Sequence, residues 1–174
     1  MPVRINVRPA CLEDISAVAT ILREYMAEAF GRSWEGSTDA LKRDGLGGEF
    51  HTLVAELSGC IIAFACWRRV YDVHHCAAGA EVTDMFVRPD HRGRALAVRL
   101  LAAVAAQAQA AGGCFLKGRS DAKVEALYRR VAVLSPGADC YVGNRAFRVL
   151  ANLTEASPRT LLRGLPDVSF NYQQ

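Results

Sequence analysis

The chain has 174 residues, of which 51% are hydrophobic and 22% are charged, and its formal net charge is +3 at pH 7. A chain of this length can bury about 70% of its unfolded surface, so it needs neither metal nor disulfide support to fold. The basic residues are spread along the chain without interleaved aromatic side chains, so we expect no nucleic-acid partner.

The N-terminal part predicts a strand followed by two helices. We expect no cleaved export signal, because the first ten residues carry Arg4 and Arg8 and no apolar region. Residues 5–8 are predicted to form a short strand that Pro9 ends. From Asp14 an amphipathic helix is predicted, because apolar residues recur at a spacing close to 3.6. These residues are Ile15, Val18, Ile21, Leu22 and Tyr25. A second short helix is predicted over residues 38–43.

The middle of the chain predicts three strands. Residues 51–56 and 60–68 form an antiparallel hairpin that turns at Ser58 and Gly59, and residues 81–87 alternate charged and apolar side chains. Residues 71–79 are expected to form a loop. The longest apolar run is far shorter than the roughly 20 residues that span a bilayer, so we expect a cytoplasmic protein without membrane contact.

The last part predicts a long helix over residues 95–110, which Gly112 and Gly113 end, and a strand over residues 114–117. A short helix follows at residues 121–130, and strands at 141–142 and 146–150 form a final hairpin. The element order predicts one α/β domain over residues 1–153 with a βαβ crossover through the long helix. Residues 154–174 are expected to form a tail.

Cysteine and histidine residues offer two further kinds of site. The six cysteines have no CxxC spacing and indicate reduced, mostly buried thiols. Cys66 and Cys114 could carry an acyl group, but neither has an evident partner histidine. His74, His75 and Cys76 are neighbours on an extended loop and point in different directions, so we expect no metal site.

The most informative stretch is Val87–Ala97, VRPDHRGRALA, which turns after Pro89 and opens into the long helix. The first N–H groups of a helix have no intrahelical acceptor, and the positive end of the helix dipole lies behind them. The stretch therefore predicts an anion-binding cradle. An ordinary turn between a strand and a helix is the alternative.

These residues resemble the GCN5-related N-acetyltransferase (GNAT) superfamily, whose cofactor loop reads Gln or Arg, two residues, Gly, one residue, Gly or Ala. Arg92 and Ala97 match this pattern, while Ala95 stands where the family usually has Gly. We expect helical dihedrals at Ala95, which a methyl group tolerates. The segments LKRDG (residues 41–45) and VTDMFVRPDHRG are most similar to the diamine and polyamine acetyltransferase branch.

The resemblance implies a mixed, mostly antiparallel central sheet of six or seven strands with about four helices. It implies acetyl-CoA as co-substrate, no metal, and a cofactor site that begins on the strand and continues into the helix. The implied cofactor-binding residues are Met85, Phe86, Val87, Arg92, Gly93, Arg94, Ala95, Leu96, Ala97, Val98 and Asp121. The alternative for Asp121 is a plain helix cap.

Two carboxylates on the predicted strand are candidates for work on the amine. An amine of lysine type has a pKa near ~10.4, so a base must remove its proton. The odd separation of Glu81 and Asp84 places them on opposite faces of a regular strand. By resemblance Glu81 is the base, while Asp84 and Thr83 lie on the substrate side. Each carboxylate could instead form a salt bridge or face solvent.

Tyr128 stands where the family carries a tyrosine near the coenzyme sulfur, so the resemblance implies a general acid. A phenol with a pKa near ~10 can protonate the departing thiolate. A core tyrosine on an amphipathic helix is the alternative. Val131 and Ala132 follow where the family usually has a Gly-aromatic pair.

The resemblance implies transfer of an acetyl group from acetyl-CoA to a primary amine of a small molecule by direct attack in a ternary complex. Acetylation of a protein lysine or N-terminus is one alternative. A non-catalytic acyl-CoA-binding module is another. Family members are often homodimers.

Overall fold

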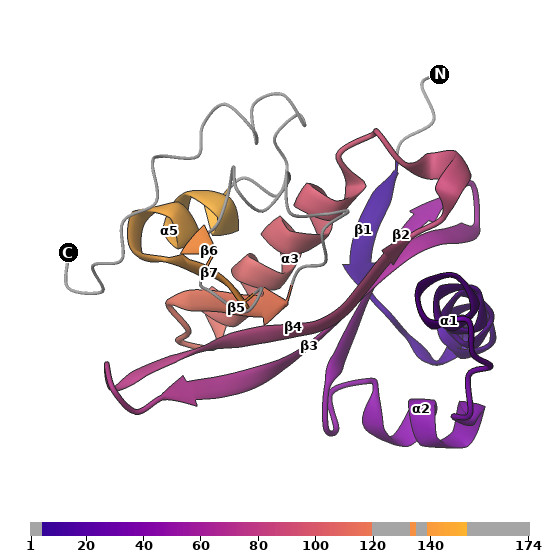
Figure 1. Cartoon of the computed structure of the whole chain (residues 1–174), viewed down its shortest axis with the longest axis horizontal. Coiled ribbons are helices and arrows are strands. Elements are labelled where there is room, and N and C mark those ends of the chain that lie inside the picture. Colours follow the sequence, from indigo (N-terminus) through magenta and orange to yellow (C-terminus); the bar gives the residue numbers. More distant parts are fainter. Residues whose placement is uncertain (1–4, 120–132, 135–138, 153–174) are drawn as a thin grey trace. The chain divides into compact units, whose positions relative to one another are not determined.

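The computed structural model describes residues 5–119, 133–134 and 139–152. Seven strands form one sheet, and four α-helices lie in the described part, as Figure 1 shows. The strands, in their order across the sheet, are β1 (Asn6–Pro9), β2 (His51–Leu57), β3 (Cys60–Asp72), β4 (Ala77–Val87), β5 (Phe115–Arg119), β7 (Asp139–Gly143) and β6 (Val133–Leu134). The helices are α1 (Ile15–Phe30), α2 (Thr38–Asp44), α3 (Leu96–Ala110) and α5 (Asn144–Asn152).

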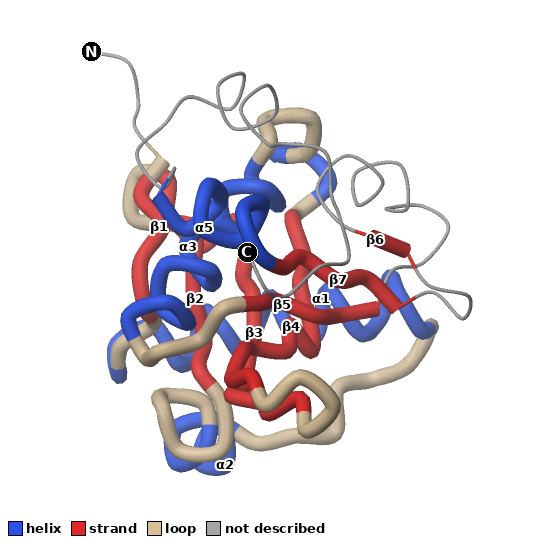
Figure 2. The backbone as a smooth tube through the Cα atoms, turned by 90° about the vertical axis from the view of Figure 1, so that its left-hand side faces the viewer, coloured by secondary structure: helices blue, strands red, loops and turns tan. Residues whose placement is uncertain are grey.

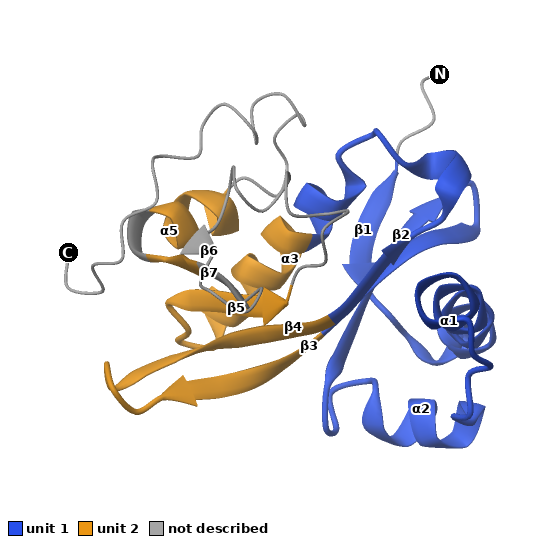
Figure 3. Cartoon of the chain, viewed as in Figure 1, with its two compact units in different colours: residues 1–66, 84–100 blue, residues 67–83, 101–174 orange. Residues whose placement is uncertain are grey.

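The chain divides into two compact units, which Figure 3 colours separately. The first comprises residues 1–66 and 84–100, and the second comprises residues 67–83 and 101–174. The strands β3 and β4 and the helix α3 each have residues in both units. A single domain over residues 1–153 stays a prediction, and the predicted tail at 154–174 lies outside the described residues.

The first unit buries the apolar face of α1. Ile15, Val18 and Ile21 are each at most 7% exposed, and they belong to one cluster with Val54 and Phe64. The strands β1 and β2 pair antiparallel and lie side by side in Figure 2. The helical period predicted for α1 is therefore confirmed, because the recurring apolar residues are the ones that lie in the core.

Charged side chains fasten the start of α1 to the sheet. Arg8 on β1 binds both oxygens of Asp14, at 2.6 and 2.9 Å, and its Nη2 also lies 2.8 Å from Glu56 on β2. The backbone N–H of Cys11 donates to Asp14 at 2.8 Å. The Arg8 guanidinium holds the pKa of Asp14 well below its ordinary value.

The second unit contains the parallel pair predicted by the crossover. The strands β4 and β5 pair parallel from Ala80 opposite Leu116 to Val82 opposite Gly118, and α3 connects them in sequence. The strand β7 pairs antiparallel with both β5 and β6. The sheet is thus mixed and mostly antiparallel, as the resemblance implies.

Two local predictions are wrong. Residues 71–79 do not form one loop, because β3 runs to Asp72 and β4 begins at Ala77, which lengthens the hairpin. Residues 146–150 are not a strand but part of α5. Ala146, Phe147, Leu150 and Ala151 are buried in α5, and this i, i+1, i+4, i+5 spacing matches a helix rather than a strand.

Candidate functional site

The loop between β4 and α3 forms the predicted cradle within the first unit. Residues 89–91 make a short 3-10 turn, and α3 begins at Leu96. The first helical hydrogen bond runs from the Arg99 N–H to the Ala95 carbonyl at 3.1 Å. The N–H groups of Leu96, Ala97 and Val98 precede that bond and have no intrahelical acceptor. They can donate to an anion, whose charge the helix dipole favours.

The backbone of this loop takes two left-handed residues. Gly93 has φ +75°, and Ala95 has φ +53°. The expectation of helical dihedrals at Ala95 is therefore wrong, because its φ is left-handed and α3 starts only at the next residue, Leu96. An L-residue with a Cβ pays roughly 1–2 kcal/mol for this conformation. The alanine at the usual glycine position is a strained residue of the cradle.

Arginines of the loop are bound to α1. Arg88 makes two hydrogen bonds to the Glu24 carboxylate, each 2.7 Å long. Arg92 donates to Glu28 at 2.7 Å and through Nε to the Val87 carbonyl at 2.9 Å. Ion pairs therefore hold the cradle loop on α1. Sequence reasoning missed Glu24 and Glu28, although their i, i+4 spacing places them on one helix face.

The other residues of the predicted cofactor site, on the loop and on β4, differ in their exposure and contacts. Arg94 is exposed, and Phe86 is 6% exposed beneath the Arg92 guanidinium, which lies 5.5 Å from the ring centroid. Met85 is half-buried on the same strand. His91 Nδ1 is the one buried side-chain nitrogen or oxygen without a hydrogen-bond partner in the described part. A buried nitrogen in that state costs roughly 1–3 kcal/mol.

Asp84 and Tyr25 form a carboxylate-phenol pair in the first unit. The Tyr25 hydroxyl lies 3.2 Å from Asp84 Oδ1, and the Tyr25 ring contacts the rings of Phe64 and Phe86 at centroid distances of 5.7 Å. Thr83, the neighbour of Asp84, is exposed. Sequence reasoning assigned Tyr25 only to the core. Its hydroxyl is instead a partner of the predicted substrate-side carboxylate.

The thiol of Cys66 is buried close to the Asp84 carboxylate. Burial, followed by the nearby Asp84 charge, raises the pKa of Cys66 to about 12. Partial burial also raises the pKa of Cys114. Because the thiolate is the nucleophilic form, both shifts oppose the role of acyl carrier. The expectation of mostly buried thiols is wrong, because Cys11, Cys60, Cys76 and Cys114 are exposed in the described part.

Glu81 lies in the second unit and is ion-paired. Its Oε2 lies 2.9 Å from Arg68 Nε and 2.8 Å from Arg68 Nη2. The Glu81 side chain is 26% exposed, so it is half-buried. Glu81 therefore forms a salt bridge, which was the alternative to its role as base. The role of Glu81 as base remains a prediction.

Tyr128 and Asp121, the predicted general acid and a predicted cofactor contact, lie outside the described residues.

His74, His75 and Cys76 are exposed near the tip of the β3–β4 hairpin, where His75 Nδ1 lies 3.0 Å from Asp72. Over the ranges 5–119, 133–134 and 139–152, no three His, Cys, Asp or Glu residues gather as metal ligands. In the same ranges, no helix is long and apolar enough to cross a bilayer.

Comparisons with known proteins identify similar sequences and folds. The family described as Acetyltransferase (GNAT) family matches residues 16–132. No curated protein matches the sequence. A ribosomal-protein-alanine N-acetyltransferase from Brucella melitensis biovar Abortus 2308 has a similar fold, with a TM-score of 0.64 and 18% identity over 76% of this chain and 94% of that chain.

Two further solved structures share the fold. A PaiA N-acetyltransferase from Thermoplasma acidophilum, in complex with coenzyme A, has a TM-score of 0.58 and 14% identity over 81% of this chain and 99% of that chain. An aminoglycoside acetyltransferase from an uncultured soil metagenomic sample, in complex with sisomicin, has a TM-score of 0.61 and 13% identity over 71% of this chain and 82% of that chain.

Proposed function

Because the chain belongs to the acetyltransferase (GNAT) family, we propose that it transfers the acetyl group of acetyl-CoA to a primary amine of a small molecule by direct attack in a ternary complex. The family makes the chain an acetyl-CoA-dependent N-acetyltransferase. The small-molecule acceptor and the residue roles are our proposal. The homodimer and the cytoplasmic location stay predictions.

The start of α3 is the observation that carries the cofactor part of the proposal. Coenzyme A contains a pyrophosphate, and the N–H groups of Leu96, Ala97 and Val98 lie at the positive end of a 15-residue helix. The left-handed residues Gly93 and Ala95 turn the backbone into that helix end. The unpartnered Nδ1 of His91 in the same loop supports the fit of a polar ligand.

The strand β4 would hold the pantetheine arm. It pairs parallel with β5 from Ala80 to Val82 and continues to Val87. We assign the backbone of Met85 and Phe86 to the arm, as the resemblance implies. The Val87 carbonyl already accepts a hydrogen bond from Arg92, so Val87 contributes less than its neighbours.

The chemistry of transfer assigns one task to each ionisable side chain. A carboxylate must take the proton of the ammonium, directly or through water, before the amine attacks the thioester carbonyl. We assign this base to Glu81 and the acceptor contact to Asp84, which Tyr25 orients. Tyr128 would return a proton to the coenzyme thiolate as the carbon–sulfur bond breaks. Asp121 would contact the cofactor.

A thiol-release assay tests the proposal. The full chain is incubated with acetyl-CoA and a panel of polyamines, amino acids, aminoglycosides and peptides. Release of coenzyme A that depends on a free small amine supports the proposal. Release with peptides alone would contradict the acceptor class and indicate a protein acetyltransferase.

A further inference from the structure

The Asp84 carboxylate differs from the other partly buried acids in its lack of a cation. Among the described residues it has no ion pair, and its one side-chain hydrogen bond there comes from the Tyr25 hydroxyl at 3.2 Å. Every other buried or half-buried carboxylate of residues 5–119 is paired with an arginine or a histidine. These carboxylates are Asp14, Glu24, Asp44, Glu56, Asp72 and Glu81. A partly desolvated carboxylate favours a positive partner, so Asp84 is suited to a cationic ligand.

Aromatic rings continue from the Asp84–Tyr25 pair to the end of α1, all within the first unit. The Tyr25 ring contacts the buried rings of Phe64 and Phe86, and it meets the Phe30 ring edge to face at a centroid distance of 5.6 Å. Phe30 is 56% exposed, so its ring extends this aromatic surface to a place that a ligand can reach. A carboxylate beside aromatic rings suits an ammonium group that carries an apolar substituent.

The described residues beside Asp84 supply no second negative charge. Thr83, its neighbour on β4, is neutral. The Cys66 thiol is neutral as well, because burial, followed by the Asp84 charge, raises its pKa to about 12. The two acids of α1 that flank Tyr25 in sequence already pair with arginines of the cradle loop. One carboxylate therefore remains, which matches one ammonium group.

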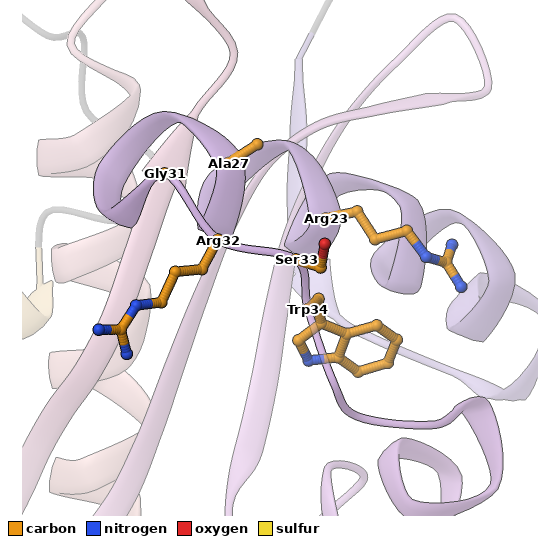
Figure 4. Close-up of a pocket in the computed structure, with 6 residues that line it drawn as sticks. All are labelled: Arg23, Ala27, Gly31, Arg32, Ser33 and Trp34. Atoms are coloured by element: carbon orange, nitrogen blue, oxygen red, sulfur yellow. The ribbon is translucent and has the colours of Figure 1, made fainter.

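The residues around the end of α1, beyond Phe30, are basic. Figure 4 shows a hollow there with six lining residues, which include Arg23 and Arg32 and no acid. The two arginine side chains extend in opposite directions, so positive charge lies on both sides of this hollow. A second ammonium group that reached past Phe30 would meet this charge and be repelled.

From these contacts we propose that the acceptor is an arylalkylamine, a monoamine in which a short carbon chain joins the ammonium group to an aromatic ring. The ammonium binds the Asp84 carboxylate, and the ring packs on Tyr25 and Phe30. This inference rests on the proposed acetyl transfer, because it names the acceptor of that reaction. Polyamines and aminoglycosides, which carry several ammonium groups, are then poor acceptors.

Thiol release separates these amine classes. Steady-state kinetics at saturating acetyl-CoA compare 2-phenylethylamine, with one ammonium and a ring, with 1,4-diaminobutane, with two ammonium groups and no ring. We expect kcat/KM to be about tenfold higher for 2-phenylethylamine, which corresponds to one favourable aromatic contact. An equal or higher value for 1,4-diaminobutane or for an aminoglycoside would overturn the acceptor class and leave acetyl transfer intact.

Phe30→Ala tests the role of the exposed ring. It should lower the preference for 2-phenylethylamine over 1,4-diaminobutane about threefold to tenfold, and Phe30→Leu, which keeps an apolar side chain, should lower it less. Tyr71→Ala is the matched control, because Tyr71 is an aromatic residue of similar exposure, 61%, near the end of β3. This control should keep the preference of the parent. A preference that Phe30→Ala leaves unchanged would overturn the proposal.

Calorimetry tests the amine site without turnover. 2-Phenylethylamine is titrated into the full chain saturated with coenzyme A, and into Asp84→Asn under the same conditions. We expect saturable binding that Asp84→Asn weakens about tenfold, the effect of losing one charge-assisted hydrogen bond. If no amine releases thiol while this binding persists, the acetyl-transfer proposal fails and the amine site stands. Absence of saturable binding, or equal binding by Asp84→Asn, would overturn the site itself.

Discussion

The Arg92 guanidinium lies 2.7 Å from the Glu28 carboxylate, so a carboxylate of α1 accompanies the cradle loop that we assign to coenzyme A. The Arg92 side chain is 47% exposed and that of Glu28 is 39% exposed, so the pair itself contributes about 0–1 kcal/mol to folding. Its larger effect is electrostatic. A negative charge beside an anion site opposes the anion and neutralises the arginine that would attract it.

Glu28→Gln should therefore tighten acetyl-CoA binding. Removal of one negative charge near a polyanion should lower the Kd about two- to fivefold at low ionic strength, and the gain should fade at about 0.5 M salt because salt screens exposed charges. Calorimetry at several salt concentrations measures the effect. Glu49→Gln, at an exposed acid beyond α2, is the control. Unchanged or weaker binding in Glu28→Gln would refute this role.

Ala95→Gly should stabilise the folded chain. Glycine relieves the strain of φ +53° but gains freedom in the unfolded chain, so the net increase in unfolding free energy should be roughly 0.5–1 kcal/mol. Urea denaturation measures it. Ala97→Gly, two residues later within α3, is the matched control and should destabilise by about 0.5–1 kcal/mol. Equal losses in both variants would show that Ala95 is unstrained.

Asp84→Asn should weaken binding of the acceptor amine without affecting binding of acetyl-CoA. A charge-assisted hydrogen bond to the ammonium is worth about tenfold in affinity, so the acceptor KM should rise by about that factor. Tyr25→Phe, which removes the hydroxyl 3.2 Å from Asp84, should cause a smaller rise. Steady-state kinetics with both substrates varied distinguishes the two KM values. Asp72→Asn on β3 serves as control, and a change confined to the acetyl-CoA KM would contradict the assignment.

Tyr128→Phe should reduce turnover far more than coenzyme binding. General acid catalysis contributes roughly a hundredfold or more, so kcat should fall by about that factor while the Kd of coenzyme A stays constant. Tyr71→Phe, at a tyrosine that is 61% exposed, should leave both values unchanged. Equal kcat in Tyr128→Phe and the parent would remove the acid role.

Asp14→Asn should lower stability at neutral pH and much less in acid. The pKa of Asp14 is lower in the folded chain than its unfolded value of about 3.9, so its ion pair with Arg8 stabilises fully above that value. The contribution is lost as the pH falls below about 4. We expect a loss of roughly 2 kcal/mol at pH 7. Urea titrations from pH 7 to pH 3 should show the gap to the parent narrowing, and a constant gap would contradict the linkage.

Most helices and strands could be predicted from the sequence because their apolar residues recur at regular spacing or because a turn signal separates them. The apolar spacing of α1 and the hairpin signal at Ser58 and Gly59 are local patterns, and the structure confirms both elements. The strand predicted over residues 146–150 is wrong because it rested on Gly143 and Asn144 as a hairpin turn, although the buried residues of α5 recur at helical spacing. The β3–β4 hairpin was cut short because polar residues near its tip are typical of loops.

The sequence by itself determined the family, the cofactor and the position of the cradle, because a loop that opens into a helix is encoded by consecutive residues. Only the tertiary structure decided what surrounds that loop. The pairs Arg92–Glu28 and Tyr25–Asp84 join residues 64 and 59 positions apart. The left-handed Ala95 is likewise decided by the path of the backbone into α3. Side chains that meet only after the strands and helices pack leave no periodic signal in the sequence.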